Sequence, residues 1–540
     1  MGPARKKLVL AYPPYTTATA PPLGVCSIKG FVERHLPEWS VKVLDLNLLA
    51  HQRALSDLNR QLCPQDIQQP EELVTQVLLS RAAETFGGQR NDEFYGRPDR
   101  CLLYANAWNR NVRALVGNFQ PQENVLRQDA PTPAQVGWCV DRILEEQPDI
   151  IGLSICYNEQ LLMSLCLATE LKKRTDVPII AGGTFFNSLG EEFLAGNAGI
   201  LDYVITGEGE KPLAAFLSGQ VAPEQVPGII SFKDGKATSN PPVFEENLDL
   251  LGEPDFSDLD LHAYYSPLPV IPITTSRGCY WRRCAFCAHY KSAGLTYRLR
   301  TIRNVIEELR RHHANGIRHF SLIDEMISPA CFSQLADAIL DSGLKIDYYA
   351  MAKPGRQFDR DLLGRMHRSG CQYILWGLES GSQRVLDLMN KGTRVDEIEE
   401  VLETAREVGL RNHVFVMFGF PTETRQEFQL TLDLLSRHKA AISHVHRGLF
   451  QLEKNSPVFD DPAKYSISRL SPSPTPGLYR FECSVGMSRQ EVQEAFAKSV
   501  LFLRGFSSDW PVLGDFWSRD HLLLIYSHAA LDSSAKGIRI

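Results

Sequence analysis

The sequence lacks any long hydrophobic run, and this absence limits where the chain can work. None of its 540 residues lies in a stretch that approaches the roughly 18 consecutive apolar residues of a membrane span. The first residues, Met1 to Lys7, include basic side chains but not the apolar stretch of a secretory signal. We therefore expect a cytoplasmic protein without a membrane span.

An excess of positive charge is also absent. The chain holds 57 Lys and Arg against 64 Asp and Glu, a formal charge of -7, so no nucleic acid is expected as a partner. Hydrophobic residues at 44% and charged residues at 22% are ordinary for globular proteins, which excludes a largely disordered chain. The length is sufficient for several domains.

Cysteine is sparse, and its distribution is uneven. Of the 12 cysteines, most are scattered as expected for small buried side chains in a reducing compartment. Cys279, Cys284 and Cys287 instead lie close together. A cluster of this kind more often binds metal than forms disulfides.

The N-terminal part alternates short apolar runs with helical stretches, which predicts a Rossmann-like open parallel sheet over residues 1–245. A segment of mixed polar and aromatic character at about 52–135 interrupts this pattern and is expected to be a mostly helical insertion. Strands are expected over residues 7–12, 40–46, 148–155, 177–181 and 203–205.

Three further regions follow. Residues 246–268 are rich in Asp, Pro and Leu without a clear period, which suits a surface linker. Strand and helix alternate again over 269–465, which predicts a parallel barrel, whole or partial, with its chemistry at the carboxyl ends of the strands. A loop at 471–477 and an amphipathic helix over 488–503 indicate a small helical extension over 466–540.

The clustered cysteines follow the first expected barrel strand with the spacing C-x4-C-x2-C. Three thiolates can hold three irons of a cubane and leave the fourth iron open to a substrate or cofactor. A zinc site with His289 as fourth ligand also fits the spacing. A closed 2Fe–2S cluster that uses Cys331 fits it as well. Spacing alone leaves these alternatives open.

The cysteine segment resembles the cluster loop of radical S-adenosylmethionine (SAM) enzymes, including Phe286 just before the last cysteine. The usual family spacing is C-x3-C-x2-C, so the first spacing here is one residue longer. Four other segments resemble marks of the same family in the same order. They are Ile323-Asp324-Glu325, Trp376 to Ser382, Met389 to Gly392 and Met417 to Thr424.

This resemblance implies a radical SAM partial (β/α)6 barrel with a 4Fe–4S cluster on Cys279, Cys284 and Cys287. An open iron that chelates SAM can pass one electron into the sulfonium and break a C–S bond, which gives a carbon radical that must be shielded. The resemblance also implies an electron donor such as flavodoxin or ferredoxin. The residues expected to position SAM are Asp324, Glu325, Gly377, Glu379, Ser380 and Phe286.

The sheet in front of such a barrel resembles the cobalamin-binding domain of B12-dependent radical SAM enzymes. The D-x-H-x-x-G sequence that supplies an axial His elsewhere is absent, because Asp45 is followed by Leu and Asn47, and His51 is expected to be a surface helix residue. This absence fits members without an axial His and also a domain that has lost B12. The residues expected near cobalamin are Ser154, Gly182, Gly183, Thr184, Gly207 and Glu208.

The sequence therefore favours a B12-dependent radical SAM enzyme that methylates an unactivated carbon of a small-molecule, lipid or peptide substrate. One alternative is cyclisation, C–C bond formation or rearrangement without methyl transfer. Another is a cobalamin or metal sensor on an inactive barrel. Side chains that could face the substrate, and are equally explained by packing, are His444, His446 and Arg447 after a late strand, together with Tyr157 and Trp376.

Overall fold

The computed structural model describes residues 5–61 without residue 17, 133–189, 196, 199–233, 236–289 without residue 267, 294–503, 521 and 524. Most of the insertion expected at about 52–135 lies outside these residues. The chain divides into two units. The first comprises Met1–Phe244, Leu251–Pro269 and Leu513–Ile540, and the second comprises Glu245–Leu250 and Val270–Val512.

The first unit is built on a seven-stranded sheet in the order β2-β1-β3-β4-β5-β6-β7. The first five strands in this order are parallel, which confirms the open parallel sheet, while β6 and β7 add an antiparallel edge that the sequence did not predict. The strands are β1 (Lys6–Tyr12), β2 (Trp39–Asp45), β3 (Ile150–Ser154), β4 (Ile179–Gly182), β5 (Tyr203–Ile205), β6 (Ile229–Lys233) and β7 (Lys236–Ser239).

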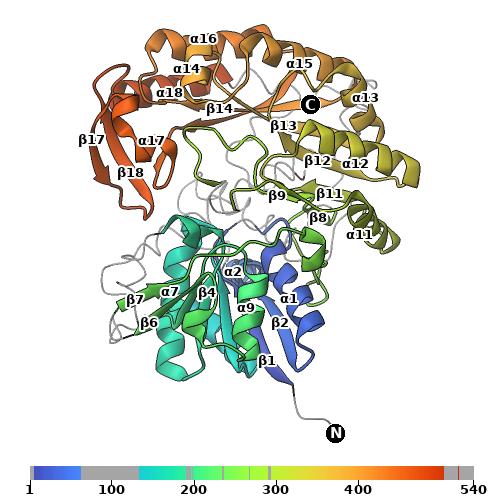
Figure 1. Ribbon diagram of the computed structural model, residues 1–540, viewed down its shortest axis with the longest axis vertical. Helices are drawn as coiled ribbons and strands as arrows, with labels where there is room; N and C mark the ends of the chain where they lie inside the picture. Colours follow the sequence, from blue (N-terminus) through green and yellow to red (C-terminus); the bar gives the residue numbers. More distant parts are fainter. Residues whose placement is uncertain are drawn as a thin grey trace. The chain divides into compact units, whose positions relative to one another are not determined.

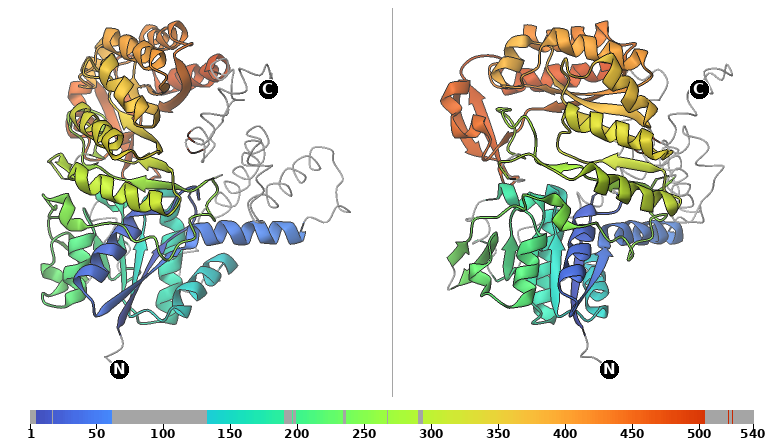
Figure 2. Two further views of the ribbon diagram at one scale, coloured as in Figure 1. Left: turned by 90° about the vertical axis from the view of Figure 1, so that its right-hand side faces the viewer. Right: turned by 45° about the vertical axis from the view of Figure 1, so that its right-hand side comes forward.

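Helices cover both faces of this sheet, as Figures 1 and 2 show. The helix α1 packs with α9, and α6 packs with α7 and α2. Each presents apolar side chains to the strands, as in α6, where Val136, Val140 and Ile143 are buried. The helices are α1 (Leu23–His35), α2 (Leu46–Gln61), α6 (Ala134–Glu145), α7 (Asn158–Arg174) and α9 (Glu210–Ser218).

Residues 251–269 pack into the first unit, in contrast to the surface linker expected there. Tyr264 and Tyr265 are buried in its apolar core. The Tyr264 hydroxyl donates to the Asp45 carboxylate at 2.7 Å, and Lys29 pairs with Asp258 at 2.7 Å. The sequence concealed these anchors because single aromatic and charged contacts follow neither a strand nor a helix period.

The second unit is built on a six-stranded parallel sheet in the order β15-β14-β13-β12-β11-β8, which confirms the partial barrel. The strands are β8 (Val270–Ile273), β11 (His319–Leu322), β12 (Asp347–Ala352), β13 (Cys371–Glu379), β14 (Arg411–Phe418) and β15 (Ile442–Leu449). His444, His446 and Arg447 follow β14 in the chain, as expected, and they belong to a further strand, β15, that the sequence did not predict. Within the described ranges, no helix combines the length and apolar character needed to cross a bilayer.

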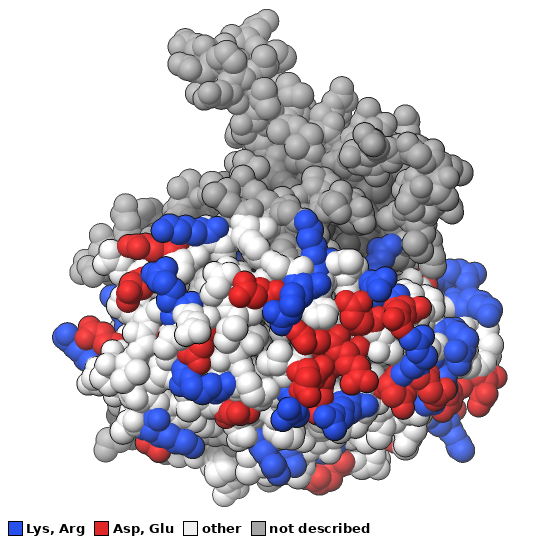
Figure 3. Space-filling model, turned by 90° about the horizontal axis from the view of Figure 1, so that it is seen from above, with Lys and Arg blue, Asp and Glu red and all other residues white. Residues whose placement is uncertain are grey.

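The helices of this unit lie along one side of its sheet (Figures 1 and 2). Seen from above, acidic and basic side chains gather in adjacent groups on this layer (Figure 3). Arg437 pairs with Glu399 between α16 and α15, and such exposed pairs contribute little to stability. The helices are α11 (Ile302–Ala314), α12 (Pro329–Ser342), α13 (Arg360–Arg368), α14 (Gln383–Leu388), α15 (Val395–Glu407) and α16 (Arg425–Arg437).

The C-terminal extension is not purely helical. The expected helix is present as α18 (Arg489–Leu503), but the expected loop at 471–477 is the turn of a small antiparallel sheet in the order β16-β18-β17. Proline and glycine at 472–477 gave the correct turn signal, and the short strands beside it were missed. The strands of the extension are β17 (Ile467–Pro472) and β18 (Leu478–Cys483), and they follow β16 (Leu452–Glu453) and α17 (Pro457–Asp460) at the end of the barrel region.

Asn412 is the polar centre of the barrel core. Its side-chain oxygen accepts from the buried Trp376 indole at 2.7 Å, and its amide donates to the carbonyls of Leu402 and Ala441 at 2.7 and 2.9 Å. Asn412→Ala leaves these groups buried without their partner, so we expect the free energy of unfolding to fall by about 3 kcal/mol. Urea unfolding tests this, with exposed Ser443→Ala as control. Equal stability of the two variants would contradict it.

Candidate active site

The cysteine loop, defined here as residues 274–289, leaves the carboxyl end of β8 and is fixed first by Asp324. This buried carboxylate accepts from the Thr275 backbone N–H at 2.9 Å and from the Ser276 hydroxyl at 2.6 Å. Burial raises the pKa of Asp324. The backbone of Cys279 then forms an isolated parallel β-bridge with that of Met326, the residue after Glu325. The Asp324 side chain therefore holds the loop, and its contact with SAM stays a prediction.

The three cysteines of the loop are partly exposed free thiols that influence one another electrostatically. Burial raises the pKa of Cys284 to about 11 and that of Cys287 to about 12, and the charge of Cys279 adds to both shifts. Among the described residues, no three His, Cys, Asp or Glu side chains could hold one metal ion. A cubane binds each of its cysteines through a separate iron, so three thiols that share no single metal position are compatible with it.

Residues 389–392 hold the middle of the cysteine loop. The Ala285 N–H donates to the Met389 carbonyl at 2.7 Å, and the Trp281 indole donates to the Asn390 carbonyl at 2.8 Å. Gly392 has a φ of 64°, and a Cβ there would lie 2.0 Å from the Trp281 ring. Residues 389–392, which resemble a family motif in the sequence, therefore form the surface against which the cysteine loop packs.

The C-terminal elements support the same loop from another side. Ala285 is buried in an apolar cluster, and its carbonyl accepts from the Val458 N–H of α17 at 3.0 Å. Phe286 packs against this cluster, as do Tyr479 and Phe481 of β18. Part of the extension therefore positions the loop, a role that the sequence did not suggest.

Glu379 and Lys391 form a buried ion pair beside the loop. The Lys391 Nζ lies 2.7 Å from the Glu379 Oε1, and Glu379 adopts a left-handed φ of 66°. Burial opposes the ammonium charge, but Glu379 and Cys284 outweigh it and raise the pKa of Lys391. Gly377 makes room for the pair, since a Cβ there would lie 2.8 Å from the Lys391 Nζ. The Lys391 ammonium also lies 5.6 Å from the Phe286 ring centre.

Lys353, which follows β12, is a site residue that sequence reasoning missed. Its ammonium donates to the Gly392 carbonyl at 2.8 Å and lies 4.1 Å from the centre of the Trp281 ring. Burial and the charge of Lys391 lower the pKa of Lys353 to about 8. The available signal was a lysine directly after an apolar strand, at the end where parallel barrels place their chemistry.

The other predicted SAM residues differ in orientation. Glu325 carries a buried Oε2 atom without a hydrogen-bond partner in the described part of the chain, and burial raises its pKa. Its charge also acts on Cys287. Ser380 is fully buried, and its hydroxyl lies 3.3 Å from that of Thr431 in α16. The structure therefore brings Glu325, but not the Ser380 hydroxyl, to the cysteine loop.

In the first unit, the residues expected near cobalamin lie at the carboxyl ends of β3, β4 and β5. Ser154 pairs in register with Gly182. The Thr184 hydroxyl donates to the Cys156 carbonyl at 3.2 Å, beside Ser154. Gly183 has a φ of 110°, and a Cβ there would lie 2.2 Å from the Ile155 carbonyl oxygen. The fold itself thus requires a glycine at position 183.

The loop after β5 is fixed in the same way. The Gly207 N–H donates to the Asn187 side chain at 2.7 Å, and Asn187 was not predicted. Gly207 has a φ of 77°, and a Cβ there would lie 2.8 Å from Pro242. Glu208 follows directly in the chain. The fold therefore favours glycine at position 207, in addition to the expected role of this residue near cobalamin.

The segment that replaces the axial-His sequence is turned inward. Asn47 is buried and accepts from the Thr16 N–H at 2.8 Å. His51 is only 1% exposed, and its Nε2 lies 2.9 Å from the Thr16 carbonyl oxygen, so the expectation of a surface residue was wrong. The His51 ring packs edge-on against the rings of Tyr15 and Tyr265, which sequence periodicity did not reveal.

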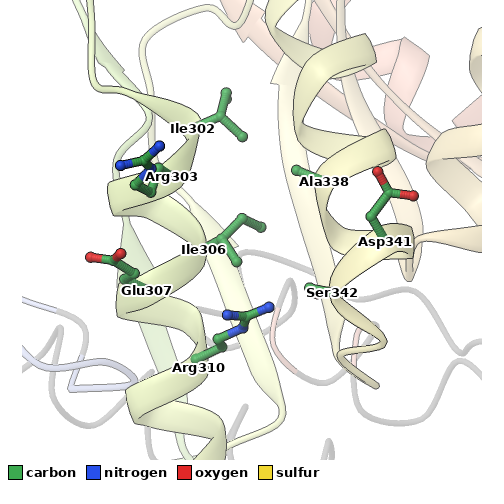
Figure 4. A pocket seen from close by; sticks show the side chains of 8 residues that line it. All are labelled: Ile302, Arg303, Ile306, Glu307, Arg310, Ala338, Asp341 and Ser342. Carbon is green, nitrogen blue, oxygen red and sulfur yellow. The ribbon is translucent and has the colours of Figure 1, made fainter.

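A separate groove with a volume of about 330 Å³ lies between α11 and α12 (Figure 4). Arg303, Arg310 and Asp341 contribute charges of both signs to its lining. None of the predicted site residues lines it. The groove belongs to the helical layer and is not part of the candidate site.

Family comparisons agree with this geometry. Residues 273–435 match the model of the radical SAM superfamily, and residues 129–217 match the model of the B12 binding domain. The chain therefore contains a radical SAM domain and, before it in the sequence, a B12-binding domain.

Three known proteins are similar over large parts of the chain. An uncharacterized methyltransferase of Pyrococcus horikoshii is 26% identical over 53% of this chain and 63% of its own length. Hopanoid C-3 methylase of Methylococcus capsulatus is 26% identical over 49% and 52%, respectively. The chain thus spans less than two thirds of the length of these two relatives.

The third similarity is to a solved structure and concerns the fold alone. The radical S-adenosylmethionine methyltransferase TsrM from Kitasatospora setae, with cobalamin and a 4Fe–4S cluster bound, has a TM-score of 0.63. Its sequence identity to this chain is 15%, with 98% of this chain and 100% of that chain covered.

Gly392→Ala should release the cysteine loop, because the new Cβ would occupy the place of the Trp281 ring. The overpacking costs about 1–3 kcal/mol, so we expect at least about fivefold faster tryptic cleavage after the exposed Arg282 and Arg283. Gly343→Ala is the matched control, since its φ of 70° is similar but its surroundings are open. Equal cleavage rates for the two variants would contradict this seat for the loop.

Proposed function

We propose that the protein is a B12-dependent radical SAM enzyme that methylates an unactivated carbon. The observation that carries this proposal is the seating of three cysteines beside the Lys391–Glu379 pair and the free Glu325 carboxylate oxygen, at the carboxyl ends of a parallel half-barrel. The radical SAM and B12 domain matches support it, as do relatives that include a hopanoid methylase.

In this proposal Cys279, Cys284 and Cys287 hold a 4Fe–4S cluster. When bound, the cluster supplies the electron that cleaves SAM, and cobalamin supplies the methyl group. Glu325 offers a carboxylate oxygen to the SAM amino group. The Lys391–Glu379 pair offers a cation to the SAM carboxylate and an acceptor to its ribose hydroxyls.

The first unit would bind cobalamin at the edge formed by Ser154, Gly182, Thr184 and Glu208. Gly182 is the glycine of this edge that the fold does not demand, because a Cβ there would make only ordinary contacts at 3.7 Å or more. A position that tolerates a methyl group but carries none leaves the backbone open to a flat ligand. The inward turn of Asn47 and His51 fits binding without an axial His.

Cys284→Ala should abolish the cluster and SAM cleavage, because a cubane held by two cysteines is not retained. After anaerobic reconstitution, we expect a cluster absorption and 5'-deoxyadenosine formation reduced by at least about tenfold. Cys331→Ala is the matched control, since Cys331 is buried in α12 against Thr275. A cluster that survives Cys284→Ala, or one that is lost in Cys331→Ala, would overturn the three-cysteine assignment.

Methyl transfer is tested by the products of SAM. With reductant and hydroxocobalamin, the reconstituted protein should form S-adenosylhomocysteine as well as 5'-deoxyadenosine, with the former about tenfold above a cobalamin-free control. Formation of 5'-deoxyadenosine alone in both reactions would favour a radical reaction without methyl transfer. If neither product forms, the reading as a sensor on an inactive barrel is favoured.

A further inference from the structure

Two buried ammonium groups lie beside the cysteine loop, and they differ in their partners. Lys391 is neutralised by Glu379 at 2.7 Å. Lys353 is 8% exposed, and in the described part of the chain no carboxylate lies within ion-pair distance of it. Its contacts are the Gly392 carbonyl at 2.8 Å and the face of the Trp281 ring.

A buried ammonium without a counter-charge is costly, because neither a carbonyl nor an aromatic face replaces a full negative charge. Glu397 attracts Lys353 from a distance, but it is already paired with Arg356 at 3.0 Å. Cys284 and Cys279 are the other groups whose charge, when their thiols are ionised, acts on Lys353. The site therefore holds one positive charge that faces the cysteine loop.

Trp281 fixes this charge relative to the loop. The tryptophan lies between Cys279 and Cys284, within the spacing that is one residue longer than usual. Its indole is held by the Asn390 carbonyl, while its ring receives the Lys353 ammonium at 4.1 Å. The contact with Trp281 thus holds Lys353 at the loop without neutralising its positive charge.

We propose that Lys353 is the counter-cation of the cluster and raises the cluster's reduction potential. Reduction adds one electron to the cluster and breaks no bond, so a fixed positive charge nearby favours the reduced form. In this role Lys353 acts through the cluster and is a positioning residue. The inference rests on the cluster site that was proposed above.

The test is a redox titration of the full-length protein, prepared without cobalamin, reconstituted with iron and sulfide, and titrated with dithionite without SAM. Electron paramagnetic resonance reports the reduced cluster. For Lys353→Met we expect the equilibrium constant for one-electron reduction to fall about tenfold, which lowers the midpoint potential by about 59 mV. Lys353→Arg keeps the charge and should remain close to the wild-type potential.

Lys345→Met is the matched control, because Lys345 is exposed and precedes the amino end of the same strand, β12. It should leave the potential unchanged. Iron and sulfide content establishes that each variant carries its cluster, and Lys353→Gln replaces the Met variant if that variant loses iron. A wild-type potential in the uncharged Lys353 variant would overturn the proposal. Absence of a 4Fe–4S cluster from the wild-type protein would instead overturn the proposed function.

Discussion

The seating of the cysteine loop on residues 389–392 is the contact on which the rest of the site depends. The Trp281 indole covers Gly392. The Ala285 backbone N–H donates a hydrogen bond to the Met389 carbonyl, and the Ala285 carbonyl accepts one from the Val458 N–H. Asp324 fixes the start of the loop through buried hydrogen bonds to Thr275 and Ser276. Three thiols on an otherwise irregular segment are thereby held at the mouth of the half-barrel.

The charges around this loop are arranged in two different ways. Glu379 and Lys391 compensate each other in a buried pair, so they add orientation rather than net charge. Lys353 adds a charge that no carboxylate within the described residues neutralises at ion-pair distance. The difference explains why two lysines so close together would serve different ends, one in binding a charged cosubstrate and the other in balancing an anionic cluster.

Much of the fold could be predicted from the sequence, because parallel strands and their covering helices produce clear periods, as in β12 to β14. Contacts made by single side chains could not be predicted. The Lys353–Trp281 contact joins residues 72 positions apart in the chain, and the Asp45–Tyr264 bond joins residues from β2 and the supposed linker. Contacts inside the fold were equally hidden for two of the motif residues, since Gly183 lies against Ile155 and the Ser380 hydroxyl against that of Thr431. Their cofactor roles stay predictions.

Three loop cysteines would leave one iron of a cubane open for SAM, and the proposed chemistry depends on this open iron. Magnetic resonance of the reduced, reconstituted protein tests it most directly, because a ligand that binds an open iron alters the signal of the cluster. We expect a 4Fe–4S spectrum whose g-values change when SAM is added. A spectrum that SAM leaves unchanged, or a site that contains zinc or a pair of irons, would contradict it.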